Sequence, residues 1–136
     1  MVRERDRRVP NCNLVNRKQL GAIGEAAAVR LLVRSGYKIR HRNFRCPLGE
    51  LDLVAEERGV LVFIEVKTRT TAEFGVPLEA VSPAKQRRLV RLATYYLAGR
   101  RLLERPCRFD AVSVVISPSG RVETVELTRD AFVPQG

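Results

Sequence analysis

The chain has 136 residues, of which 45% are hydrophobic, so it can form one globular domain and is not an intrinsically disordered protein. It lacks an apolar run long enough to cross a bilayer and the apolar stretch of a secretory signal, so we expect a cytoplasmic protein that does not contact membranes. Three well-separated cysteines and a single histidine argue against a zinc centre and a disulfide framework.

The net charge of +10 is distributed as two basic segments around an acidic one. Residues 1–45 hold 12 basic and 3 acidic residues, residues 46–82 hold 3 and 7, and residues 83–105 hold 7 and 1. A polyanion such as nucleic acid is the natural partner of the basic segments. A ribosome-associated or merely basic protein is the alternative, since charge alone does not exclude it.

The elements are predicted from apolar spacing and end signals. Residues 1–16 lack an apolar period, so we expect a flexible basic arm before a single domain at 17–136. A helix is expected from 17 to about 35, where Gly36 ends it. The later elements are a strand at 37–44, two hairpin strands within 49–69, a loop at 70–81, a helix at 83–99, and strands at 108–116 and 121–127. The order α-β-β-β-α-β-β predicts an α/β (α+β) fold with a small mixed sheet flanked by helices.

The second helix has a clear beginning, because Ser82 is a good N-cap and Pro83 suits the first helical position. Its first turns carry basic residues that lie largely off the apolar stripe, namely Lys85, Arg87, Arg88 and Arg91. We expect this basic group to bind nucleic-acid phosphates. A solvated basic face is the alternative.

The segment GELDLVAEERGVLVFIEVKTR, residues 49–69, places charges in the most strand-like part of the chain. Side chains two residues apart on a strand point the same way, so Glu50 and Asp52 share a face, as do Glu65 and Lys67. The spacing therefore gathers three carboxylates and one amine within a single hairpin.

The two charged pairs face each other if the turn between the strands has four residues. Ala55 then pairs with Val60, Glu50 lies opposite Glu65, and Asp52 lies diagonal to Glu65 at roughly 7–8 Å between backbones. A turn with an odd number of residues would place the pairs on opposite faces.

Carboxylates that lie together in a largely apolar sheet repel one another and lose hydration. A divalent cation would resolve this, and ligands that are all oxygen favour Mg²⁺ or Mn²⁺. Lys67 beside such a cation could stabilise developing negative charge or orient a water molecule, which suits hydrolysis of a phosphodiester. Ordinary surface ion pairs, each worth about 0–1 kcal/mol, are the alternative.

Asp52 followed by EVK at 65–67 resembles the D…(D/E)xK signature of the restriction-endonuclease-like, or PD-(D/E)xK, nuclease superfamily. Leu51 stands where the superfamily name has proline, a common departure that leaves the chemistry unchanged. The chain as a whole resembles the YraN-type family of small bacterial proteins. The blocks that carry this resemblance are GEAAAVRLL (24–32), GYKIRHRNFR (36–45), GELDLVA (49–55), VFIEVKTR (62–69), FGVPLEAV (74–81) and RFDAVSV (108–114).

The resemblance implies a central mixed sheet flanked by helices, and cleavage or processing of DNA with Mg²⁺. By position, it implies that Asp52, Glu65 and the backbone carbonyl of Val66 are metal ligands and that Lys67 is the catalytic lysine. Glu25 matches an acidic residue that many junction-resolving members place near the metal. Junction resolvases of this fold act as dimers, so a homodimer is one arrangement to test.

We therefore expect a Mg²⁺- or Mn²⁺-dependent nuclease that acts on DNA, with branched or damaged DNA as candidate substrates. Arg69, just beyond the lysine, is expected at a phosphate, whereas Asp110 is expected to pair with an arginine outside the site. A nucleic-acid-binding protein that keeps the nuclease fold without turnover is the alternative. The choice between DNA and RNA, and the need for a partner protein, stay open.

Overall fold

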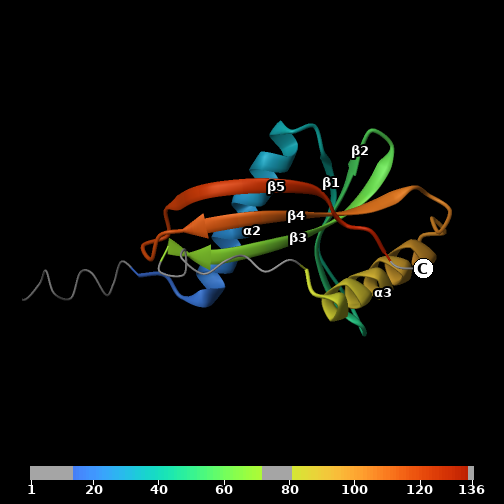
Figure 1. The fold of residues 1–136 in the computed structure, drawn as a ribbon, viewed down its shortest axis with the longest axis horizontal. Helices are drawn as coiled ribbons and strands as arrows, with labels where there is room; N and C mark the ends of the chain where they lie inside the picture. Colours follow the sequence, from blue (N-terminus) through green and yellow to red (C-terminus); the bar gives the residue numbers. More distant parts are fainter. Residues whose placement is uncertain (1–13, 72–80, 135–136) are drawn as a thin grey trace, which may run out of the picture.

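The computed structural model describes residues 14–71 and 81–134. Its helices and strands, in chain order, are α2 (Arg17–Arg34), β1 (Lys38–Cys46), β2 (Gly49–Glu57), β3 (Val60–Thr70), α3 (Pro83–Gly99), β4 (Cys107–Ile116) and β5 (Val122–Phe132). The predicted order α-β-β-β-α-β-β is confirmed (Figure 1). Most of the predicted arm, and most of the predicted loop after β3, lie outside the described residues. In the described ranges, neither helix is long and apolar enough to span a membrane.

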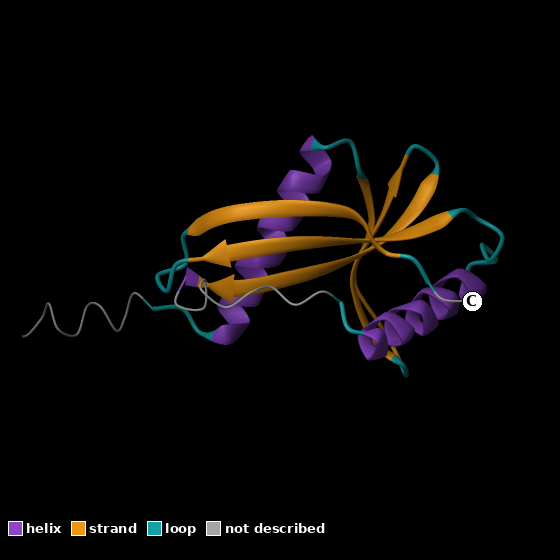
Figure 2. Cartoon of the chain, in the orientation of Figure 1, coloured by secondary structure: helices purple, strands orange, loops and turns teal. Residues whose placement is uncertain are grey.

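The strands form one mixed sheet in the order β1-β2-β3-β4-β5. Neighbouring strands are antiparallel except for β3 and β4, which are parallel and are connected through α3. Figure 2 shows the two helices on either side of this sheet, with α2 crossing behind β3, β4 and β5. Each helix covers its own apolar cluster, so the central strand β3 is buried on both faces.

Both helices begin at the residues that the sequence indicates. The Asn16 side chain accepts the backbone N–H of Gln19 at 2.8 Å, and the Gln19 side chain accepts the N–H of Asn16 in return, which forms a capping box at the start of α2. Ser82 caps α3 by accepting the N–H of Lys85 at 3.2 Å, and Pro83 occupies the first helical position.

The last strand is longer than predicted, because it continues to Phe132 rather than ending at residue 127. Phe132 stacks on Phe109 of β4 with 4.7 Å between the ring centroids, and the two residues pair across the ladder. This aromatic contact extends the pairing of β4 with β5 beyond the point where the alternating pattern of the sequence ends.

The predicted register of the β2–β3 hairpin was wrong. The turn contains only Arg58 and Gly59, which have φ values of 53° and 80°, so Glu57 rather than Ala55 pairs with Val60. A two-residue turn with positive φ at both positions matches the twist of the flanking strands. The register moves by two residues, an even number, so the shift by itself does not move any side chain to the other face of the sheet.

Gly24 allows α2 to lie directly against β3. A Cβ atom at this position would stand 2.0 Å from Thr68 Oγ1 and 3.1 Å from Thr68 Cβ. Gly21, one helical turn earlier, has open space where its Cβ would be. The close approach at Gly24 sets the distance between the helix that carries Glu25 and the strand that carries Glu65.

We expect Gly24→Ala to lower the free energy of unfolding by about 1–3 kcal/mol, because the added methyl group forces the helix away from the strand. Urea denaturation measures this. The matched control is Gly21→Ala, which should instead stabilise the protein by about 1 kcal/mol through helix propensity alone. Similar gains from both substitutions would show that α2 does not depend on the close approach.

Candidate active site

The candidate site lies where β2 and β3 separate. Their ladder ends at the pair Leu53 and Ile64, although both strands continue past it. Figure 1 shows that β2 begins beside α3, whereas β3 continues along the sheet. Leu51 packs in the cluster under α3 and Leu53 in the cluster under α2, although residues two apart normally share a face. The chain therefore turns at Asp52.

The side chain of Asp52 accepts a hydrogen bond from β3 beyond the point where the β2–β3 ladder ends. Its Oδ2 accepts the backbone N–H of Val66 at 2.8 Å. The N–H and C=O groups of one strand residue point to the same side, so the Val66 carbonyl also faces this opening. The opening therefore presents a carboxylate and a backbone carbonyl from two strands.

Glu65 is the second carboxylate at the opening. Its side chain is 11% exposed, and its Oε1 lies 2.8 Å from the ammonium nitrogen of Lys85. Its Oε2 is buried and accepts no hydrogen bond from the residues that the structure describes. Lys67 follows two residues later on β3 and is half-buried, so strand alternation places it on the same side as Glu65, facing α3.

Glu25 approaches from α2 and is oriented by β1. Its Oε1 accepts hydrogen bonds from Arg42 Nε at 3.2 Å and from Asn43 Nδ2 at 3.0 Å. Asn43 has a φ of 55°, a conformation that asparagine tolerates better than most residues. The sequence analysis did not identify Arg42 or Asn43, because their contact with Glu25 depends on how α2 packs across the sheet.

The carboxylates of Asp52, Glu65, Glu50 and Glu25 interact electrostatically. Burial, together with the charges of Glu65, Glu50 and Glu25, raises the pKa of Asp52 to about 6, against the lowering effect of the Val66 N–H. Glu50 is exposed and lies 2.7 Å from Arg45. Asp52 is therefore held in a position where its negative charge is unfavourable.

One set of residues at this opening could bind a divalent cation. The described residues hold no group of three His, Cys, Asp or Glu side chains placed to bind a metal ion, so a three-carboxylate site does not form in this arrangement. The set that fits is Asp52, Glu65 and the Val66 carbonyl, whose donors are all oxygen. The buried Glu65 Oε2 supports this fit, because a buried polar atom normally has a partner.

A family model described as "Uncharacterised protein family UPF0102" matches residues 24–114. The chain belongs to this family. The YraN-type resemblance that the sequence blocks indicate is thereby confirmed.

Three members of the UPF0102 family illustrate how far the similarity extends. The UPF0102 protein of Moorella thermoacetica is 52% identical over 118 residues, which cover 87% of this chain and 98% of the relative. That of Lachnoclostridium phytofermentans is 46% identical over 123 residues, covering 90% and 99%. That of Caldicellulosiruptor saccharolyticus is 43% identical over 118 residues, covering 87% and 100%. These names state no activity, so the function of this UPF0102 chain is argued from its site.

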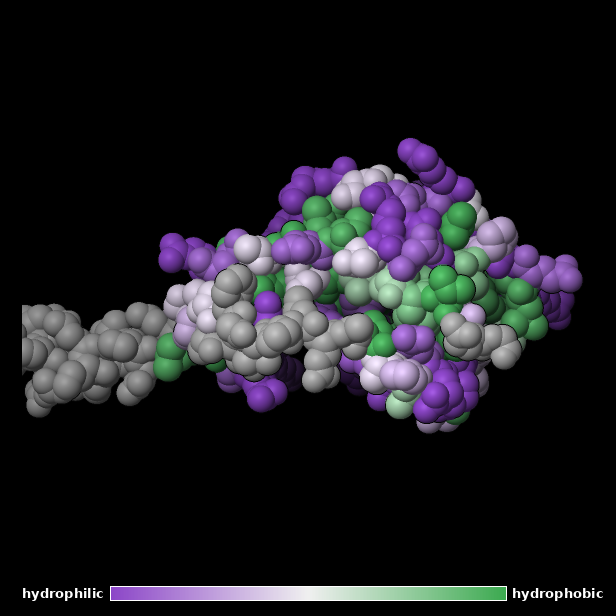
Figure 3. All heavy atoms as spheres, in the orientation of Figure 1, coloured by the Kyte–Doolittle hydropathy of each residue, from purple (hydrophilic) through white to green (hydrophobic). Residues whose placement is uncertain are grey.

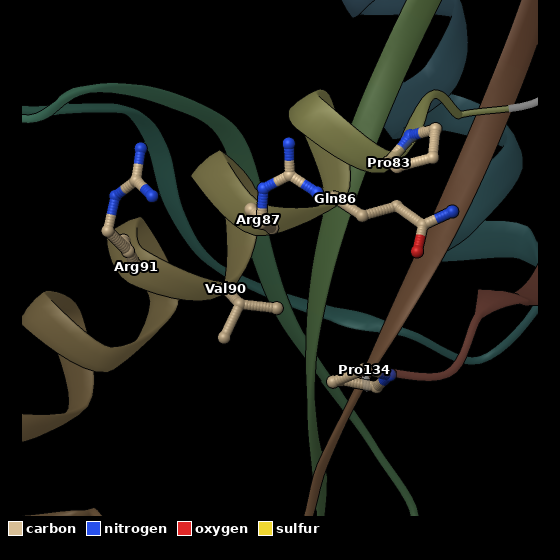
Figure 4. A pocket seen from close by; sticks show the side chains of 6 residues that line it. All are labelled: Pro83, Gln86, Arg87, Val90, Arg91 and Pro134. Carbon is tan, nitrogen blue, oxygen red and sulfur yellow. The ribbon is translucent and has the colours of Figure 1, made fainter. Parts of the chain in front are cut away.

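The four basic residues of α3 that are predicted to bind nucleic acid lie in three places. Lys85 contacts Glu65 at the site itself. Arg87 and Arg91 are exposed and line a hollow of about 320 Å³ between α3 and Pro134, shown in Figure 4. Arg88 is exposed on α3, where Figure 3 shows polar side chains gathered on the outer side of the helix.

Arg69 lies at the other end of the site. With residues from the start of α2, it lines a hollow of about 340 Å³, whose described lining is Arg17, Leu20, Gly21, Thr68, Arg69 and Thr70. Arginines therefore line one hollow beside α2 and another beside α3. This positive charge suits the binding of a polyanion.

Proposed function

We propose that this UPF0102 chain is a cytoplasmic, Mg²⁺- or Mn²⁺-dependent nuclease that hydrolyses phosphodiester bonds of DNA, with branched or damaged DNA as the candidate substrates. One observation carries the proposal: Asp52 accepts the N–H of Val66 where β2 and β3 separate, next to Glu65, whose buried Oε2 has no hydrogen bond among the described residues, and Lys67 follows on the same strand. Buried carboxylates without a matching set of donors reduce stability, which favours a role for them in binding a cation.

Each residue has a distinct role in this proposal. Asp52, Glu65 and the Val66 carbonyl hold the cation, which when bound polarises a phosphate oxygen and lowers the pKa of water. Lys67 presents an ammonium group on the Glu65 side of β3, where it stabilises negative charge on the phosphate and orients the attacking water. Glu25 assists from α2, at the distance that the Gly24 contact sets.

Binding of the substrate depends on the surrounding arginines rather than on base recognition. Arg69 contacts a phosphate on the α2 side of the opening, and Arg87, Arg88 and Arg91 contact the backbone along α3. Aromatic residues make up only 6% of the chain, so stacking on bases contributes little.

The test is cleavage of labelled duplex, single-stranded, flap, four-way-junction and RNA substrates with Mn²⁺, Mg²⁺ or EDTA. We expect metal-dependent cutting by the wild-type protein and none by Lys67→Ala, because the substitution removes the ammonium group that the proposed mechanism requires. Lys38→Ala is the matched control, since Lys38 is an exposed lysine at the start of β1, and it should cut as the wild type does.

Absence of cutting by the wild-type protein, together with salt-sensitive binding that Lys67→Ala retains, would favour the alternative of a non-catalytic nucleic-acid-binding protein. Equal cutting by the wild-type and Lys67→Ala proteins would indicate a contaminating nuclease. Cutting of RNA alone would retain the mechanism and change the substrate.

A further inference from the structure

Lys85 lies at the carboxylates rather than on the outer surface of α3. Its ammonium nitrogen is 2.8 Å from Glu65 Oε1, and its side chain is 34% exposed against 11% for Glu65. The ion pair is thus partly withdrawn from water on the lysine side and nearly buried on the glutamate side. In such surroundings a charge pair is screened less than on the surface.

The start of α3 is fixed in a way that holds Lys85 in place. Ser82 accepts the backbone N–H of Lys85 at 3.2 Å, and the Gln86 side chain donates to the carbonyl of Val81 at 2.8 Å. Leu89, one turn further, is buried in the cluster under this helix. The position of the ammonium group therefore follows from the capping and packing of α3.

The contact gives Glu65 the cation that a buried carboxylate requires. Lys85 neutralises Oε1, while Oε2 accepts no hydrogen bond from the described residues. A divalent ion bound by Glu65 would meet the ammonium charge at the same carboxylate, and two cations so close repel each other. Lys85 and a metal ion therefore compete for Glu65.

We propose that Lys85 is a built-in counter-cation of Glu65, which stabilises the metal-free site and which a divalent ion has to displace. Lys85 thereby weakens metal binding and sets the metal concentration at which the site fills. This inference rests on the proposed function, because it takes Glu65 as a metal ligand.

The experiment is titration of metal-free protein with Mn²⁺, with free Mn²⁺ followed by electron paramagnetic resonance. We expect Lys85→Met to bind Mn²⁺ about tenfold more tightly than the wild type, because the competing charge is gone. Arg30→Met is the control: it removes one positive charge from an exposed residue of α2 and should change the affinity little.

Thermal unfolding in EDTA gives a second readout. Lys85→Met should unfold at a lower temperature than the wild type, because Glu65 is left buried without its cation, and added Mn²⁺ should recover the loss. Lys85→Arg keeps the charge and can bind a carboxylate with two donors, so it should bind Mn²⁺ more weakly than the wild type. That variant tests the inference even if Lys85→Met does not fold.

The two proposals fail in different ways. Mn²⁺ binding by the wild type that Glu65→Gln abolishes would establish the metal site whatever Lys85 does. If Lys85→Met then binds no more tightly than Arg30→Met, the inference is overturned and the proposed function stands. If the wild type, Lys85→Met and Lys85→Arg all fail to bind Mn²⁺, both are overturned, and Lys85 is only a structural partner of Glu65.

Discussion

Replacing Asp110 by asparagine is expected to lower the free energy of unfolding by about 3–5 kcal/mol, which is a large part of the stability of a small domain. Asp110 is 2% exposed. Its Oδ1 accepts from Arg108 Nε at 3.0 Å and from the backbone N–H of Asp130 at 2.9 Å. Its Oδ2 accepts from the Tyr37 hydroxyl at 2.6 Å and from Arg108 at 3.2 Å. Asparagine would set an N–H₂ group against these donors and leave Arg108 with only one of its two carboxylate partners.

The surroundings of Asp110 show a structural network rather than a second site. Arg108 also donates to Glu57, and Arg129 donates to the other oxygen of Glu57 at 2.7 Å. Hydrogen bonds from Arg129 and Arg108 hold the pKa of Glu57 down at about 2, against the effect of burial. Burial and the hydrogen bond to Asp110 raise the pKa of Tyr37 to about 12. Every charge here has an opposite partner, which confirms the prediction that Asp110 pairs with an arginine.

Urea denaturation at neutral pH measures the effect, with Asp130→Asn as the matched control. Asp130 is exposed and contacts Asp110 through its backbone N–H rather than its side chain. Its φ is 52°, which asparagine tolerates, so the control should lie within about 0.5 kcal/mol of the wild type. A loss from Asp110→Asn no greater than that of the control would mean that the network contributes little to stability.

Local signals in the sequence predict most of the fold. Ser82 and Pro83 mark the start of α3, and Gly36 follows the end of α2, because caps and breakers act within a few residues. The hairpin turn was not predicted, because an arginine at positive φ is not a turn signal and a four-residue turn fits the same letters. The extension of β5 depends on an aromatic contact with β4, which no local pattern encodes.

Some features of the candidate site also follow from local sequence signals, whereas others depend on packing between elements. Alternation along β3 places Glu65 and Lys67 on one side, and this prediction is independent of the error in register because both residues lie on the same strand. The position of Asp52 opposite β3 follows from the corrected turn. Two contacts join helices to strands through packing, Lys85 to Glu65 and Arg42 to Glu25, and sequence spacing could not have indicated either.

Replacing Asp52 by asparagine is expected to have the opposite effect to the same change at Asp110, and to stabilise the metal-free protein at pH 8 by about 2–3 kcal/mol. The pKa of Asp52 is raised to about 6, chiefly by burial, from about 3.9 in an unfolded chain. Between these values the folded state holds a proton that the unfolded state has released. The free energy of unfolding therefore falls as pH rises through this window and stays reduced above it.

Asparagine at position 52 does not titrate, so this pH-dependent loss of stability disappears. The hydrogen bond to β3 is kept, because the asparagine Oδ1 can still accept the N–H of Val66. Urea denaturation in EDTA should give equal stabilities for wild type and Asp52→Asn near pH 4 and a more stable variant at pH 8. Glu123→Gln, which neutralises an exposed strand carboxylate, should show no such divergence. Adding Mn²⁺ at pH 8 should stabilise the wild type and not the variant, since the variant has lost a charged ligand. A less stable Asp52→Asn in EDTA would mean that Asp52 stabilises the fold as Asp110 does. A more stable variant would mean that the charge of Asp52 destabilises the metal-free fold, as expected for a carboxylate whose charge a bound cation compensates.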